Sequence, residues 1–216
     1  MKKIFTFLLM LILALSSYAQ TNVTKFLGIP VDGSREKMEK QIEKKGFKKV
    51  EIDGENLFIG EFNGQEVILA IKTNKNKVCR IVVLNYNNII DESQIINRFN
   101  QLYNQFLNNS KYELAGGEMI DKDENISYQM KVKNKVYEAV FYQAGTQEEI
   151  NEMLLSKYTE EQLENPSKKL EKEISNYINE KVNNKMVWFK AFEDGAGYRI
   201  AIFYDNKYNF PNGEDL

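Results

Sequence analysis

The stretch from 47 to 86 constrains the fold of this chain more than any other part of its sequence. Its apolar runs are separated by Asp53-Gly54, Asn63-Gly64 and Asn74-Lys75-Asn76. Asn-Gly or Asp-Gly between apolar runs is the strongest short-range signal for a β-hairpin, because the tight turn needs a positive φ at both central residues. The sequence therefore predicts four consecutive antiparallel strands, with 48–53 at an edge of the sheet.

Successive side chains of a strand point to opposite faces of the sheet, and these strands have apolar residues on both faces. Leu57 and Ile59 are expected on the same face as Val67 and Leu69, and Phe58 is expected on the opposite face. Apolar side chains on both faces are typical of strands that are covered on both sides.

The rest of the chain alternates between helical and strand patterns. Ser34 is a candidate N-cap for a helix over 34–45, and apolar residues three and four positions apart predict a second helix over 91–108. Further strands are predicted at 112–114, 126–132, 136–142, 186–192 and 198–204. Two capping boxes and a Pro-Ser step predict a helical insertion over 146–182, before the last two strands.

This order of elements predicts an α+β fold with a mostly antiparallel sheet and helices packed on one face. We expect a first helix-plus-meander unit over 20–88 and a second unit over 89–205 that contains the insertion over 146–182. The two units resemble tandem helix-plus-four-strand repeats, although the second unit is predicted to carry a fifth strand. The polar tail over 206–216 is expected to be flexible.

The N-terminus predicts export. Lys2 and Lys3 precede a short apolar run from 4 to 15, and Ser17-Tyr18-Ala19 places small residues at the −3 and −1 positions of a cleavage site. This pattern is typical of a secretory signal peptide over 1–19, and its apolar run is too short to span a membrane. We therefore expect a periplasmic or extracellular protein with no membrane-spanning segment after cleavage.

The chain contains no histidine, which removes the commonest general base and zinc ligand and excludes Ser-His-Asp and Cys-His catalysis. The only cysteine, Cys79, lies in a predicted strand and is expected to be a small buried apolar residue. The formal charge is −2 with Lys, Asp and Glu interspersed, so no cationic surface for nucleic acid is expected. We predict no catalytic residue, no metal site, no cofactor and no nucleic-acid partner.

Two motifs have both a functional and a structural interpretation. The run Asp-Lys-Asp-Glu-Asn over 121–125 places oxygens at alternate positions, but Ile126 and Val132 stand where a calcium loop needs Gly and Glu. A solvated loop is the better interpretation. Asp32-Gly33-Ser34 at a helix start could hold an anion. It lacks a glycine-rich phosphate pattern, so helix capping is the better interpretation there.

Aromatic residues gather in the last third of the chain. On paired strands one face of such a group becomes core, and the other face can form a surface for a protein or glycan partner. The candidates for this partner-binding surface are Trp188, Tyr198, Tyr204 and Tyr208. The sequence thus predicts an exported, non-enzymatic binding module. The alternatives are a histidine-independent hydrolase that uses paired carboxylates and a role in the cell envelope without a discrete ligand.

Residues 25–47, KFLGIPVDGSREKMEKQIEKKGF, resemble the N-terminal signature of uncharacterised small exported proteins from Bacteroidetes. In those proteins a similar Gly-Ile-Pro-Val-Asp-Gly precedes a helix that ends in Lys-Gly-Phe. The resemblance implies an exported bacterial protein and names no activity. The order of a helix and four antiparallel strands, taken twice, is also similar in architecture to the repeats of the β-lactamase inhibitory protein. No residue motif carries that inhibitor's function over to this chain.

Overall fold

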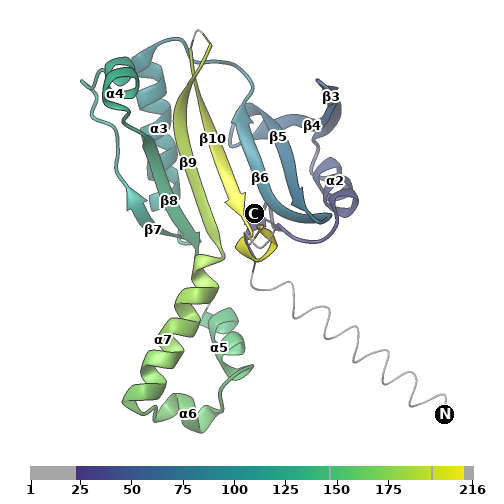
Figure 1. The fold of residues 1–216 in the computed structure, drawn as a ribbon, viewed down its shortest axis with the longest axis vertical. Helices are drawn as coiled ribbons and strands as arrows, with labels where there is room; N and C mark the ends of the chain where they lie inside the picture. Colours follow the sequence, from purple (N-terminus) through teal and green to yellow (C-terminus); the bar gives the residue numbers. More distant parts are fainter. Residues whose placement is uncertain (1–22, 146, 196, 212–216) are drawn as a thin grey trace, which may run out of the picture.

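The computed structural model of this chain describes residues 23–145, 147–195 and 197–211. The predicted signal peptide and the end of the predicted tail, 212–216, lie outside the described residues. The described chain has an α+β fold built around one eight-stranded antiparallel sheet, as the sequence predicts (Figure 1).

The strands of this sheet follow the order β3-β4-β5-β6-β10-β9-β8-β7. Their bounds are β3 Lys48–Ile52, β4 Glu55–Phe62, β5 Gln65–Asn74, β6 Lys77–Asn85, β7 Tyr112–Gly117, β8 Tyr137–Gln143, β9 Met186–Asp194 and β10 Gly197–Asp205. The first four form the predicted meander, and β3 lies at the predicted edge. A separate pair, β1 (Lys25–Phe26) and β2 (Ile29–Pro30), precedes them.

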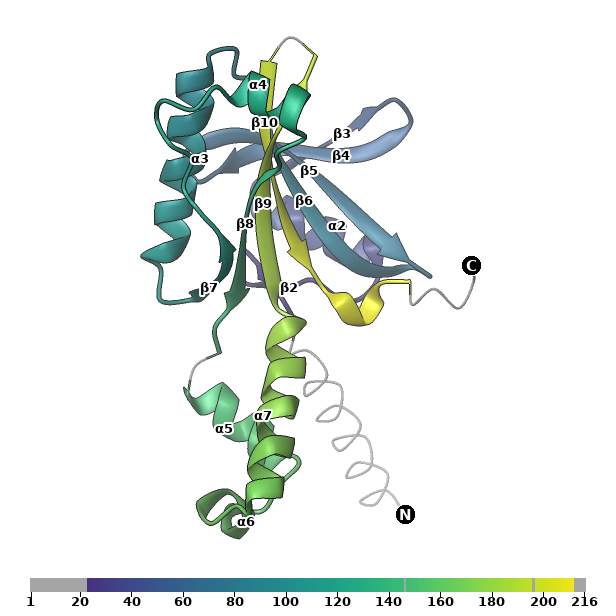
Figure 2. The ribbon, with the colours of Figure 1, turned by 60° about the vertical axis from the view of Figure 1, so that its left-hand side comes forward.

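The helices of the described chain fall into three groups. Their bounds are α2 Arg35–Lys44, α3 Glu92–Leu107, α4 Ile126–Lys133, α5 Gln147–Leu155, α6 Glu160–Glu164, α7 Lys168–Asn183 and the 3-10 helix η1 Lys207–Asn209. α2 and α3 pack on the sheet, and α4 and η1 are short connecting elements. α5, α6 and α7 form the insertion between β8 and β9, which extends away from the sheet (Figure 2).

A helix followed by four strands occurs twice in this order. α2 precedes β3 to β6, and α3 precedes β7 to β10. The last strands of the two series, β6 and β10, pair at the centre of the sheet, where Val83 faces Ile202 and Ile81 faces Tyr204. The strand order of the second series therefore mirrors that of the first, and both series share one sheet.

The sequence predicts a strand over 126–132, but this segment forms the helix α4. Its apolar residues alternate, yet Ile126 is fully buried and Val132 is 57% exposed. Asn125 caps the helix by accepting a hydrogen bond from the Tyr128 amide at 2.8 Å. Asn134 ends α4 with a φ of +53°. These two local caps outweigh the alternating pattern, and the second series keeps four strands rather than five.

The pairing of β4 with β5 also differs from the expectation. Phe58 faces Leu69 across the two strands, so it shares the core face with Val67. Leu57 and Ile59 lie on the other face. The reason is the two-residue turn at 63–64, which makes Phe62 the partner of Gln65 and thereby fixes every later pair.

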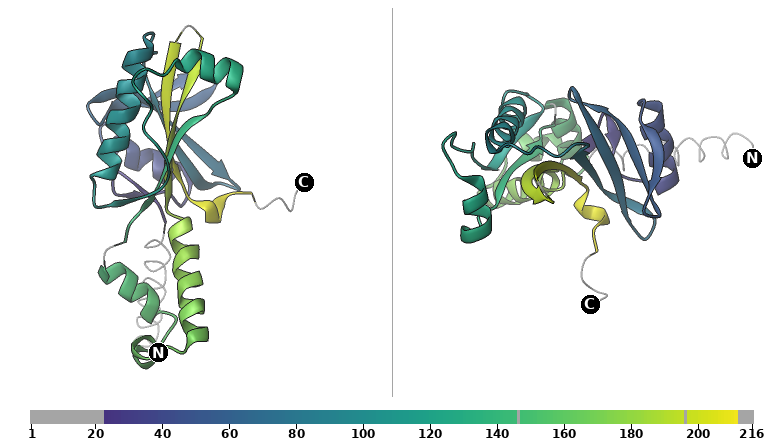
Figure 3. Two further views of the ribbon diagram at one scale, coloured as in Figure 1. Left: turned by 90° about the vertical axis from the view of Figure 1, so that its left-hand side faces the viewer. Right: turned by 90° about the horizontal axis from the view of Figure 1, so that it is seen from above.

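One hydrophobic core lies between the sheet and the helices α2 and α3. Met38 and Ile42 of α2 are buried in it, and so is a longer stripe of α3 that includes Ile95, Phe99 and Leu102. Both helices lie on the same side of the sheet (Figure 3). The predicted packing of helices on one face is confirmed.

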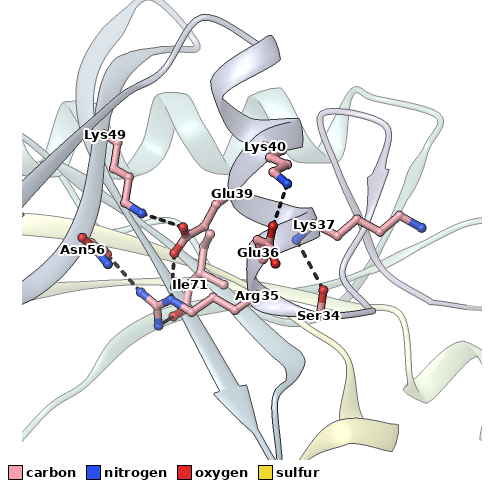
Figure 4. A network of polar contacts seen from close by, with 9 residues as sticks. All are labelled: Ser34, Arg35, Glu36, Lys37, Glu39, Lys40, Lys49, Asn56 and Ile71. Carbon is pink, nitrogen blue, oxygen red and sulfur yellow. Dashed lines mark hydrogen bonds and ion pairs between the residues drawn. The ribbon is translucent and has the colours of Figure 1, made fainter.

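A network of polar side chains fixes α2 on the meander (Figure 4). The Arg35 guanidinium donates to the carbonyl oxygens of Ile71 and Asn56, at 3.1 Å each. Its Nε lies 2.9 Å from one carboxylate oxygen of Glu39, and Lys49 lies 2.7 Å from the other. Burial alone would raise the pKa of Glu39, but the hydrogen bonds from Lys49 and Arg35 outweigh it and hold this pKa below the ordinary 4.5.

The first part of the predicted tail forms hydrogen bonds with the lead-in and the meander. Asn206 is buried and donates from Nδ2 to the Val31 carbonyl at 2.8 Å. Asn209 donates from Nδ2 to the Val78 carbonyl at 2.7 Å. The amide side chains of Asn206 and Asn209 thus pair with main-chain carbonyls of the lead-in and of the meander, and the flexibility of the tail over 206–216 stays a prediction.

Candidate partner-binding face

The face of the sheet turned away from α2 and α3 carries a continuous row of small and apolar residues. One line of Cα partners crosses all eight strands and joins Val50, Leu57, Ala70, Val82, Phe203, Trp188, Val140 and Gly116. We call this line the apolar row, and the sheet face that carries it the open face. Figure 1 looks onto this face, with α3 behind the sheet.

Every residue of the apolar row is half-buried. The next line of Cα partners on the same face has charged residues at both ends. Lys48 is the partner of Ile59 at one end, and at the other end Lys190 pairs with both Ala201 and Glu138. Charged residues therefore lie on both sides of the apolar row: toward the ends of this neighbouring line, and at the partners Lys72, Arg80 and Asp205 on the other side. Protein interfaces also combine an apolar core with a polar rim.

An aromatic and cationic cluster occupies the middle of the open face. The rings of Trp188 and Phe203, which are cross-strand partners, stack with centroids 4.0 Å apart and planes 15° apart. The Arg80 guanidinium carbon lies 5.5 Å from the Trp188 centroid, 5.0 Å from that of Phe203 and 5.1 Å from that of Phe210. These distances are those of cation–π contacts.

Asp205 holds this cluster in place. Its carboxylate accepts two hydrogen bonds from Arg80, at 2.6 and 2.9 Å, and a third from the indole Nε1 of Trp188 at 2.9 Å. The residue is fully buried. Three donors satisfy this buried carboxylate, so Asp205 positions Arg80 and Trp188.

The four aromatic residues predicted as one surface do not lie together. Trp188 lies on the open face. Tyr208 lies in η1 and is 51% exposed, and its hydroxyl is 3.0 Å from the Lys181 ammonium. Tyr198 and Tyr204 are only 5% and 3% exposed. The expectation that these two are exposed is wrong, because alternation along β10 turns them to the helix side together with Ile200.

The two buried tyrosines have no free hydroxyl for a partner. The Tyr198 hydroxyl lies 2.6 Å from the Ser127 hydroxyl and 3.3 Å from Glu92. Burial raises the pKa of Tyr198, and burial together with Tyr112 raises the pKa of Tyr204 well above the ordinary 10.0. Both are neutral core residues at every physiological pH.

Arg80, Phe203 and Asp205 are not among the residues that the sequence predicts for a partner-binding surface. One signal was available for Arg80, because it stands inside the apolar strand β6 in the same alternating set as Val82 and Leu84. An arginine in such a set needs a buried or surface anion. Nothing local in the sequence points from Arg80 to Asp205, which lies 125 residues later.

The candidate calcium loop forms a turn and a helix cap. Asp121 accepts a hydrogen bond from the Asp123 amide at 3.0 Å, and Lys135 lies 2.6 Å from Glu124. Asn125 is the N-cap of α4. Within the described ranges, no three His, Cys, Asp or Glu residues lie close enough together to hold a metal ion. The contacts at 121–125 are those of the solvated-loop interpretation.

Two further expectations concern single residues. Ser34 caps α2 by accepting a hydrogen bond from the Lys37 amide at 3.4 Å, which is the structural interpretation of Asp32-Gly33-Ser34. Cys79 is 5% exposed and its pKa is raised by burial, so it is the small buried residue that the sequence predicts.

Two glutamates of the first unit lie opposite each other on neighbouring strands, but neither is buried. Glu61 and Glu66 are direct partners on β4 and β5, and both are exposed. A glycosidase needs one carboxyl that is held protonated by a poorly solvated environment. This pair does not supply one, and it does not favour the hydrolase alternative.

No protein-family model, no curated protein and no solved structure matches this chain. The class of the protein is therefore defined by its own geometry: an α+β protein with two helices on one side of an eight-stranded antiparallel sheet and an apolar row on the other. None of the helices in the described part of the chain is long and apolar enough to cross a membrane.

Proposed function

We propose that this chain is an exported, non-enzymatic binding module and that its open face binds a protein partner. The observation that carries this proposal is the apolar row, which crosses all eight strands on the side away from α2 and α3. Sheets that are apolar on both faces are normally covered on both faces. A large apolar surface with a polar rim marks a site of interaction.

The central cluster fits a protein partner better than a glycan. Trp and Arg are the residues most enriched at the energetic centres of protein interfaces, and Arg80 and Trp188 are held rigidly by Asp205. A sugar ring binds on the free face of an aromatic ring. Trp188 is already stacked on Phe203 and contacted by Arg80, which leaves little of its ring for a sugar.

Export is the part of this proposal that rests on sequence. The basic start, the apolar run and the cleavage pattern over 1–19 support a periplasmic or extracellular location. The predicted partner is therefore a protein of the envelope or of the outside medium.

A charge placed in the apolar row tests the proposal. The mature chain is immobilised and exposed to envelope extract of the producing cell, and the retained proteins are compared for wild type, Val82→Lys and Gln101→Lys. Val82 is half-buried in the row, whereas Gln101 is exposed on α3, so the control adds the same charge to the opposite side. We expect a retained protein that Val82→Lys loses at least about tenfold, since a desolvated charge costs well over 1.4 kcal/mol.

The control and the melting temperature make the result decisive. Gln101→Lys is expected to retain the same protein as wild type, and all three chains are expected to melt cooperatively. The proposal fails if a folded Val82→Lys chain retains the same proteins as wild type. It also fails if the wild-type chain retains no protein beyond those that bare resin retains from the same extract.

A further inference from the structure

A cavity of about 330 Å³ lies on the helix side of the sheet, away from the open face. It opens where the C-terminal half of α3, the turn between β4 and β5 and the turn between β1 and β2 meet. Its apolar wall is built by Leu27, Phe62, Leu102, Phe106, Tyr112 and Tyr204. Cavities of this size, lined by aromatic and aliphatic side chains with a few polar groups, are typical of small-molecule sites.

Apart from Glu61 and the two tyrosine hydroxyls, the polar side chains that line the cavity are the amides of Asn63, Gln105 and Asn109. The Asn63 amide nitrogen donates to the Gln105 side-chain oxygen at 2.6 Å. This bond joins the β4–β5 turn to α3. It leaves the Asn63 oxygen and the Gln105 nitrogen available for one further hydrogen bond each.

Charge at the cavity disfavours an acidic ligand. Glu61 is the one Asp, Glu, Lys or Arg among the residues that line it. Among the described residues, no Lys or Arg lines the wall, so an anionic head group would be desolvated without a counter-ion from them and would face a carboxylate. An uncharged molecule meets neither cost.

Leu27 supplies an independent observation. It has a φ of +50° and is followed by Gly28 at +79°, so the turn between β1 and β2 has a positive φ at both central residues. Such turns favour Asn, Asp or Gly at the first position, because a leucine there is strained. Two turns of the meander follow this preference, at Asp53 and Asn63, whereas the third has Lys75 at its first position with a φ of +48°.

The strain at Leu27 is not explained by burial. The residue is 38% exposed, so an asparagine would suit the turn better and would cost little core packing. What Leu27 does contribute is one wall of the cavity. Strained residues of this kind gather at ligand sites.

We infer that this cavity binds a small uncharged molecule that is mainly apolar and has one hydrogen-bonding group at the Asn63–Gln105 rim. Leu27 completes the apolar wall of the site and holds a strained positive φ in its turn. The site is separate from the open face and does not depend on the proposed protein partner.

The test uses the mature chain and a neutral fluorescent probe, N-phenyl-1-naphthylamine. The probe is titrated into the protein, and then displaced at pH 7.5 by 1-decanol or by decanoate, which differ mainly in head-group charge. We expect saturable binding at one site per chain and displacement by decanol at a concentration at least about tenfold lower than by decanoate, since an unpaired buried charge costs more than 1.4 kcal/mol.

Leu27→Asn separates the site from the fold. It relieves the strained turn, so the melting temperature is expected to stay the same or rise, while probe affinity falls about tenfold through the lost apolar wall. Leu155→Asn makes the same change on the distant helix α5 at a similar exposure of 47% and is expected to leave affinity unchanged. Val82→Lys on the open face is also expected to bind the probe normally.

Four outcomes would overturn the inference. One is the absence of saturable probe binding to the wild-type chain. Another is displacement by decanoate as effective as that by decanol. The other two are equal probe affinity of Leu27→Asn and wild type, and a loss of affinity in Leu155→Asn equal to that in Leu27→Asn. A failed pull-down with a normal probe titration would reject the proposed function and leave this site standing.

Discussion

At the scale of single residues, the open face depends on how one buried carboxylate is satisfied. Asp205 takes two hydrogen bonds from Arg80 and one from Trp188, and these bonds hold a cation against the stacked rings of Trp188 and Phe203. The arrangement needs no ligand to form. The cluster is therefore preorganised for contact, which lowers the entropy cost of binding.

Removal of the carboxylate leaves its donors without an acceptor. Asp205→Ala is expected to lower the free energy of unfolding by about 3 kcal/mol, because the half-buried Arg80 guanidinium and Trp188 N–H lose a fully buried partner. Asp194→Ala is the matched control: its carboxylate pairs with Arg199 at 2.9 Å but is 43% exposed, so a loss of about 0.5 kcal/mol is expected. Urea denaturation measures both, and equal losses would contradict this role of Asp205.

At the scale of elements, the turns and caps of this chain decide the structure more than its apolar pattern does. The turns at Asp53-Gly54 and Asn63-Gly64 form where the sequence predicts them, with positive φ at all four residues. The alternating pattern predicts the wrong face for Leu57, Ile59 and Phe58 relative to β5. The number of residues in the turn at 63–64 sets this register, and the pattern does not contain that number. In 126–132 the Asn125 cap prevailed over an alternating run.

The network between α2 and the meander makes a prediction about pH. Glu39→Gln is expected to lower the free energy of unfolding by about 1 kcal/mol at pH 7, because the carboxylate receives charged hydrogen bonds from Arg35 and Lys49. The pKa of Glu39 in the folded state lies below 4.5, so its contribution is complete above that pH and is lost as the pH falls through the folded value.

Denaturation curves of the two chains at several pH values check this. The gap between wild type and Glu39→Gln should be constant from pH 8 to 6 and should close toward pH 3. Glu36→Gln removes the exposed pair with Lys40 on the same helix and should have a smaller effect. A gap that widens in acid would show that the sign of the pKa shift is wrong.

At the scale of the whole molecule, the two helix-plus-four-strand series share one sheet through β6 and β10. The sequence predicts the helix-and-strand order of the first series, that of the second series except at 126–132, and the packing of helices on one face, because these follow from local turns and periodicity. It does not predict the central pairing, since Ile81 and Tyr204 are far apart in the chain and no local signal joins them. That pairing places Tyr198 and Tyr204 over the core, and it makes Arg80 and Asp205 direct partners.

The same pairing creates the open face, because it joins the apolar positions of both series into one row. The most direct measurement of the central claim is photo-cross-linking in the producing cell from a photoreactive phenylalanine at position 192, on the open-face side of β9, compared with the same group at position 107 on α3. We predict one discrete protein adduct from position 192 that disappears in the Val82→Lys chain, and none from position 107. Adducts of equal yield from both positions, or no adduct from position 192, would contradict the account.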